Sequence, residues 1–191
     1  MEHSIDNELL VINTLVYVDQ AFKVKSSNLS VFDTLENIGK DAVVDKDSVI
    51  NSEEWQCLKQ YIEDNADVYQ NLYINNIETQ NGSKKLTLTD NDNNMYIVFQ
   101  GTSSGYEWND NGMGAYSNVV QTPSQKKAVD YYDRMVEQYG EGKNIYVSGH
   151  SKGGNEAQYV GILRGEQITR VYSFDGQDKG NVISAGLQPC L

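Results

Sequence analysis

The chain has 191 residues, 39% hydrophobic and 22% charged, which is long enough for one domain with a sizeable core and short for two. Its formal net charge is −12, and Lys and Arg occur in runs no longer than pairs, which argues against a nucleic-acid-binding protein. No segment approaches the roughly 20 consecutive apolar residues of a transmembrane helix. Cys57 and Cys190 lack metal-binding or redox spacing, so we expect neither a metal site nor a disulfide framework.

The N-terminus does not have the pattern of a cleaved secretion signal. Glu2, Asp6 and Glu8 precede or flank the start of the short apolar run 9–12, whereas the first region of a signal peptide is positively charged. We therefore expect a protein that is cytoplasmic, or one that is exported without a cleaved signal peptide.

Helical patterns dominate residues 1–68. Apolar residues recur at a loose helical spacing over 7–22, and a second short helix is predicted over 31–38. A third helix is predicted to begin at Asn51, which has capping-box spacing with Glu54. We expect these helices to pack over a sheet.

Strand patterns follow, and they alternate with helices towards the C-terminus. The predicted strands are 73–79, 85–89, 95–99, 145–147 and 169–174. Segment 95–99 is apolar throughout, which indicates a strand buried on both faces. A helix is predicted after Thr122, with Pro123 and Gln125 as further start signals, and another over 155–163. This alternation favours a parallel sheet covered by helices.

The segment Gly149-His150-Ser151-Lys152-Gly153 has the G-x-S-x-G pattern of a nucleophile elbow. A serine hydroxyl is a poor nucleophile unless it is held exposed and a base removes its proton. The elbow meets the first need by placing the serine on a sharp turn between a strand and a helix. Because a predicted strand precedes Ser151 and a predicted helix follows it, we interpret Ser151 as a nucleophile of the α/β-hydrolase type.

Acyl transfer also needs hydrogen-bond donors for the oxyanion. In this fold one donor is the backbone N–H after the nucleophile, here Lys152, and the other comes from the loop after an earlier strand. Gln100-Gly101-Thr102 follows the 95–99 strand and is in the right place. The alternative is a glycine-containing turn that simply leaves the sheet.

We expect one α/β-hydrolase-like domain over 1–191, with a mostly parallel sheet covered by helices. Its parts are a helical N-terminal cap region (1–68), a sheet core with the elbow (69–177) and an irregular tail (178–191).

Three segments together resemble the class 3 (fungal triacylglycerol-type) lipases: 98–102 (Val-Phe-Gln-Gly-Thr), Trp108, and the elbow 149–154. They are more similar still to a bacterial lipase-like branch in which Lys follows the serine and a Phe-Asp-Gly segment, here 174–176, follows the next strand. The resemblance covers roughly 72–177.

The resemblance implies that Ser151 is the nucleophile and that Thr102 and Lys152 form the oxyanion hole. It further implies hydrolysis of carboxylic esters of lipids without a metal or an organic cofactor. The residues expected on the substrate side are Trp108, in a loop or lid, Gly101 and His150. Packing beside the strand is the structural alternative for His150.

The catalytic base is missing from this pattern. α/β-Hydrolases have the order Ser, acid, His, yet the two histidines are His3, in the N-terminal tail, and His150, which neighbours Ser151 and is expected to point away from it. Asp175 is either the triad acid or a turn residue. The chain resembles a form truncated after the 169–174 strand, so we expect a partner chain or a missing C-terminal segment to complete the sheet.

Two functions follow from these observations. The first is serine-dependent hydrolysis of an ester or lipid substrate, with thioester or amide hydrolysis as a variant. The second is a catalytically incomplete hydrolase-like module that binds a partner or lipid through its open sheet edge and a tyrosine-rich surface. Tyrosine is frequent, at 13 residues against four Phe, although this excess is equally well explained by composition alone.

Overall fold

The computed structural model describes residues 4–17, 29–36, 52–80, 83–101 and 122–174. The strands are β1 (Leu29–Ser30), β2 (Leu72–Gln80), β3 (Ser83–Asp90), β4 (Asn94–Phe99), β5 (Asn144–His150) and β6 (Arg170–Phe174). The helices are α1 (Ile5–Leu15), α2 (Val31–Glu36), α3 (Ser52–Asp64), α4 (Ala66–Tyr69), α6 (Pro123–Tyr139), α7 (Lys152–Arg164) and the short 3₁₀-helix η2 (Gly165–Gln167). No helix within these ranges has both the length and the apolar character needed to cross a membrane.

The six strands form one sheet in the order β1-β2-β3-β4-β5-β6. The α/β class and the helix-covered sheet are confirmed, but the sheet is mixed rather than mostly parallel. The pairs β1–β2, β2–β3 and β3–β4 are antiparallel, and only β4–β5 and β5–β6 are parallel. Connection length explains all of these pairs except β1–β2: only a few residues separate β2 from β3 and β3 from β4, whereas the links that contain α6 and α7 are long enough to cross over and return in parallel.

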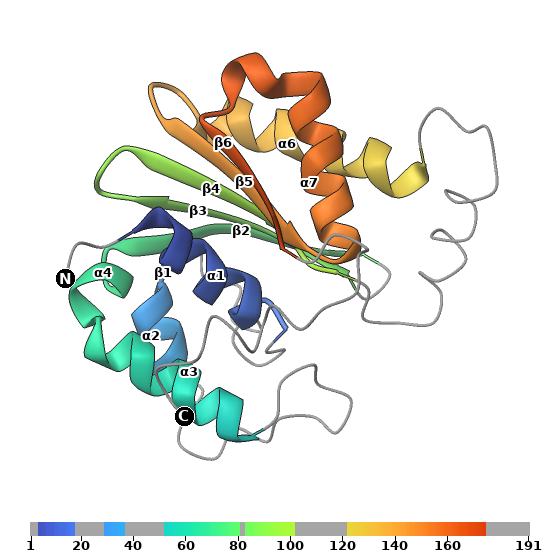
Figure 1. Ribbon diagram of the computed structural model, residues 1–191. Helices are drawn as coiled ribbons and strands as arrows, with labels where there is room; N and C mark the ends of the chain where they lie inside the picture. The colour runs from blue at the N-terminus through green and yellow to red at the C-terminus, as the bar shows by residue number, and fades with distance from the viewer. Residues whose placement is uncertain (1–3, 18–28, 37–51, 81–82, 102–121, 175–191) are drawn as a thin grey trace.

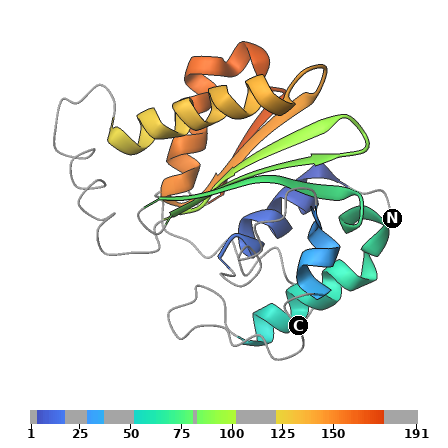
Figure 2. The ribbon, with the colours of Figure 1, turned by 180° about the vertical axis from the view of Figure 1, so that it is seen from behind.

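Helices cover both faces of the sheet, as Figures 1 and 2 show from opposite sides. The helices α1 to α4 lie on one face, and α6 and α7 lie on the other. Side chains of β4 alternate between the two cores. Tyr96 and Val98 join the core under α1, while Met95, Ile97 and Phe99 join the core under α6 and α7. The prediction that this strand is buried on both faces is therefore confirmed.

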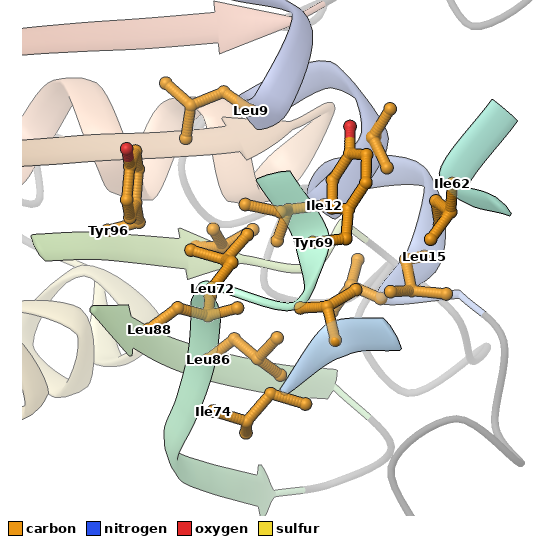
Figure 3. Packing of buried hydrophobic residues seen from close by; sticks show 14 of the residues in the cluster. Leu9, Ile12, Leu15, Ile62, Tyr69, Leu72, Ile74, Leu86, Leu88 and Tyr96 are labelled. Atoms are coloured by element: carbon orange, nitrogen blue, oxygen red, sulfur yellow. The ribbon is translucent and has the colours of Figure 1, made fainter. Parts of the chain in front are cut away.

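The core on the α1 side joins the N-terminal helices to the sheet (Figure 3). Leu9, Ile12 and Leu15 of α1 are fully buried, and they belong to one cluster with Leu86 and Leu88 of β3. Removing apolar surface from water stabilises a fold by roughly 25 cal/mol per Å². The burial of these side chains is therefore the main contribution that holds α1 on the sheet.

On the opposite face, α6 begins as the sequence predicts. The Thr122 side chain accepts the Gln125 N–H, and the Gln125 side chain accepts the Thr122 N–H, which is a complete capping box with Pro123 in the first turn. Such a cap typically contributes about 1 kcal/mol. The helix then buries Tyr131, Tyr132 and other residues of its inner face.

The tyrosines are largely a core feature in the described residues, which corrects the expectation of a tyrosine-rich surface. Of the 11 tyrosines among the described residues, six are buried, and they are Tyr17, Tyr69, Tyr96, Tyr131, Tyr132 and Tyr146. A tyrosine ring can fill an apolar core while its hydroxyl meets a polar group at the edge of that core. The Tyr131 hydroxyl, for example, lies 2.9 Å from the Thr87 hydroxyl of β3.

The buried tyrosines predict a loss of stability at alkaline pH. Burial raises the pKa of Tyr132 to about 12 and also raises the pKa values of Tyr69, Tyr96 and Tyr131. An unfolded chain releases its tyrosine protons near pH 10, so above about pH 10 the unfolded state binds fewer protons than the folded state. The free energy of unfolding should therefore fall as the pH rises through this range.

Ultraviolet titration of tyrosine ionisation, with circular dichroism as a monitor of folding, checks this expectation. In the folded protein only part of the 13 tyrosines should ionise near pH 10, and the rest should ionise together with unfolding. In denaturant all of them should titrate together. Complete ionisation near pH 10 with a native circular dichroism spectrum would contradict the burial described above.

Candidate active site

Ser151 lies at the sharp turn between β5 and α7, where the sequence predicts the elbow. Its backbone has φ 53° and ψ −119°, a conformation that non-glycine residues rarely adopt and that costs about 1–3 kcal/mol. It occupies the N-cap position of α7, yet its side chain makes no capping hydrogen bond. The predicted succession of strand, turn and helix is confirmed.

Two glycines make this turn sterically possible. A Cβ added to Gly149 would overlap the carbonyl oxygen of Gly153, and a Cβ added to Gly153 would overlap the carbonyl oxygen of Phe99. The first turn of α7 thus packs backbone against backbone on β5 and β4. The glycines of G-x-S-x-G are needed here because no side chain fits between these segments.

Gly101 lies directly beside the elbow. The parallel register pairs Phe99 of β4 with Gly149 of β5, so the chain leaving β4 reaches the end of the sheet next to Ser151. A Cβ added to Gly101 would lie 2.6 Å from the His150 carbonyl oxygen and 3.2 Å from the Ser151 Cβ. The structure therefore brings together Gly101 and Ser151, as predicted. Thr102 and Trp108 lie outside the described residues.

Lys152 is the first residue of α7, and its side chain is buried. The N-terminal end of a helix carries a partial positive charge and N–H groups without intrahelical acceptors. The Lys152 backbone is thus at the end of α7 where negative charge is favoured. On the other side of the turn, the Ser151 N–H donates to the Phe174 carbonyl at the end of β6, 2.9 Å away. Asp175, the next residue, lies outside the described residues.

His150 faces α1, on the sheet face opposite α7. Its Nδ1 lies 2.9 Å from the Tyr17 hydroxyl, and the two rings meet edge to face with centroids 5.7 Å apart. This agrees with packing beside the strand, the structural interpretation of His150. His3 lies outside the described residues.

Tyr17 is a residue that the sequence reasoning did not single out. Its hydroxyl also accepts the Gly101 N–H, at 3.0 Å, so one side chain contacts both segments that flank Ser151. The available signal was weak: Asn13 and Tyr17 lie four residues apart, on one face of the first predicted helix. Nothing in that spacing indicates which strand the face meets.

Among the described residues, no group of three or more His, Cys, Asp or Glu side chains lies close enough together to bind a metal ion. The chemistry available in the described residues comes from a strained serine, the α7 N-terminus and backbone at the β4 exit.

Comparisons with known proteins found a family match and a structural match. The family described as Mbeg1-like matches residues 59–184. Among solved structures, one match is a fungal lipase–inhibitor complex, described as a model for interfacial activation in lipases. It is 16% identical, with a TM-score of 0.43, and the alignment covers 83% of this chain and 56% of that one. The chain thus spans a little over half the length of that lipase. A search of curated proteins found no match.

Substituting Gly153 by Ala tests the close approach of α7 to β4. The added methyl group would meet Phe99 backbone, which cannot move aside as a side chain can, so we expect Gly153→Ala to lower the free energy of unfolding by about 3 kcal/mol or more. Gly165→Ala is the matched control, because a Cβ there meets nothing within 4 Å and the backbone is helical. It should change stability by less than about 0.5 kcal/mol.

Urea unfolding followed by circular dichroism measures both variants. Equal stability of the two would show that the elbow does not require the backbone contact described here.

Proposed function

The chain belongs to the Mbeg1-like family, and we propose that it is a serine-dependent hydrolase of carboxylic esters, in particular lipid esters, with Ser151 as the nucleophile. The observation that carries the proposal is the strained turn at Ser151, with φ 53°, which does not use the serine hydroxyl as a helix cap. Strain of this kind persists where the surrounding structure enforces it, and it is concentrated at active sites. Here the glycine contacts of α7 with β4 and β5 enforce it.

In the proposed reaction, Ser151 Oγ attacks the carbonyl carbon of the ester and its proton passes to a base. The carbonyl oxygen becomes an oxyanion, for which we propose the Lys152 N–H at the start of α7 as one hydrogen-bond donor. A second donor is proposed from Thr102, which follows Gly101. The bond to the leaving alcohol then breaks, the alcohol takes up the proton, and water hydrolyses the acyl-serine.

The base is proposed to come from outside the described residues. No histidine follows Ser151 in the sequence, and the His150 ring is engaged with Tyr17 on the α1 side. We propose Asp175 as the acid, because it directly follows Phe174, whose carbonyl accepts the Ser151 N–H. A partner chain or a further segment would supply the imidazole. Without a base, several orders of magnitude in rate are lost, although an oxyanion hole alone retains residual catalysis.

The lipid ester is proposed as the substrate class from the resemblance of 72–177 to class 3 lipases. A catalytically incomplete module that binds a partner or lipid is the second candidate. The observation that favours it is that the ring of His150, the described histidine, contacts the Tyr17 hydroxyl.

Labelling with a fluorophosphonate separates the two candidates. We expect slow covalent labelling of the wild-type chain at Ser151, with loss of fluoride, because the elbow retains residual reactivity without the base, and a fall to background in Ser151→Ala. Ser173→Ala is the control, because Ser173 is opposite Gly149 on β6 and its hydroxyl is buried. That variant should label as the wild type does, and peptide mass spectrometry should place the label on Ser151.

Hydrolysis of p-nitrophenyl esters of short and long acids, compared with a thioester and an amide, then identifies the acyl class. Absence of wild-type labelling above the Ser151→Ala level would reject the hydrolase proposal for this chain and favour the binding module.

A further inference from the structure

The Tyr17 hydroxyl connects two backbone segments that meet at Ser151. It accepts the N–H of Gly101, the second residue after β4, at 3.0 Å, and it lies 2.9 Å from Nδ1 of His150, the last residue of β5. With its oxygen occupied by the Gly101 N–H, the hydroxyl still has its own hydrogen to donate to Nδ1. A single atom thus joins the β4 exit to the elbow strand.

Helix and strand spacings explain why Tyr17 reaches this point. Asn13 Nδ2 donates to the Ser148 hydroxyl at 2.8 Å, and Tyr17 contacts His150. Four residues of helix advance about 6 Å, and two residues of strand advance about 6.6 Å. The two pairs therefore remain roughly in step, and the turn that follows α1 brings Tyr17 to the end of β5, where Ser151 follows.

Lys84 of β3 fixes the same region from the other side. Its Nζ donates to the carbonyl of Val16, the residue before Tyr17, at 3.1 Å. Its backbone N–H donates to the Gln100 side chain at 2.8 Å, and its carbonyl accepts the Gln100 N–H at 2.9 Å. One residue thus holds the carbonyl of Val16 and both the N–H and the side chain of Gln100, the residues before Tyr17 and Gly101, which keeps the Tyr17 hydroxyl opposite the Gly101 N–H.

Burial strengthens this connection. Tyr17 is 6% exposed, and Gly101 is buried. In such surroundings a hydrogen bond is electrostatically stronger than in water, and an N–H that loses its acceptor is not easily compensated by solvent. Gly101 also has no space for adjustment, since a Cβ added to it would lie 2.5 Å from the Tyr17 hydroxyl oxygen.

We propose that Tyr17 is a positioning residue of the active site, whose hydroxyl holds the β4 exit at Gly101 against the elbow and so sets the geometry around Ser151. Its catalytic consequence rests on the proposed function. Tyr17 precedes the family match at 59–184, so this part of the site is supplied by the turn after α1, outside the matched segment.

Tyr17→Phe tests the proposal, with Tyr172→Phe as the matched control. The Tyr172 hydroxyl also ties α1 to the sheet, through Asp6 Oδ1 at 2.6 Å, but it does so from β6 at the other end of the helix. Both variants lose one hydroxyl that anchors α1. Only Tyr17→Phe removes the acceptor of the Gly101 N–H.

The first measurement is the rate of fluorophosphonate labelling at Ser151, resolved into the reagent's binding constant and its maximal rate, at a temperature where both variants are fully folded. Tyr17→Phe should lower the maximal rate by about 10-fold to 100-fold with little change in the binding constant, because misplacement near 1 Å has effects of this size. Tyr172→Phe should remain within about 2-fold of the wild type. Equal labelling of Tyr17→Phe and the wild type overturns the positioning role.

The second measurement is hydrogen exchange of the Gly101 amide by NMR, which does not depend on activity. Exchange should accelerate by at least about 10-fold in Tyr17→Phe and remain unchanged in Tyr172→Phe. Unchanged exchange in Tyr17→Phe overturns the proposal even if labelling falls. If the wild type does not label at all, the proposed function fails, and Gly101 exchange still decides whether Tyr17 holds the β4 exit.

Discussion

The contact between the first turn of α7 and the backbones of β4 and β5 is the constraint on which the rest of the site depends. Gly149 and Gly153 lack side chains, so α7 can begin directly against the sheet. The chain must then reverse within one residue, and Ser151 takes φ 53° as a result. The same approach puts Lys152, at the positive end of α7, beside the serine. One steric requirement thus produces both the strained residue and the polar environment around it.

The mixed sheet supplies the second half of the site. Because β4 pairs in parallel with β5, both strands end at the same edge, and Gly101 emerges next to Ser151. Because β4 also pairs with β3 in the antiparallel direction, Lys84 lies beside Gln100 and contacts the end of α1 as well. The transition between antiparallel and parallel pairing therefore occurs at β4, the strand that Gly101 follows.

Tyrosine hydroxyls connect α1 to this sheet along its length. Tyr172 contacts Asp6, Tyr96 contacts Glu8, and Tyr17 itself contacts His150. Each ring contributes apolar surface to a core or its margin, and each hydroxyl ends on a polar group between helix and sheet. A phenylalanine would fill the same space without the polar contact. This is a physical reason for tyrosine rather than phenylalanine at these three positions, and it differs from the surface role that composition suggested.

The sequence by itself determined the local features, whose causes lie within a few residues: the capping box at Thr122, the apolar β4 strand, and the elbow at Ser151, where strand, glycine spacing and helix are contiguous. Tertiary structure alone decided the antiparallel pairing of β1 with β2 and the contacts of Tyr17. Pairing direction depends on how connections fold in space, and the Tyr17 hydroxyl meets a glycine 84 positions away in sequence. The spacing of residues along the sequence predicts which side chains lie on the same face of an element, but not which distant part of the backbone that face will contact.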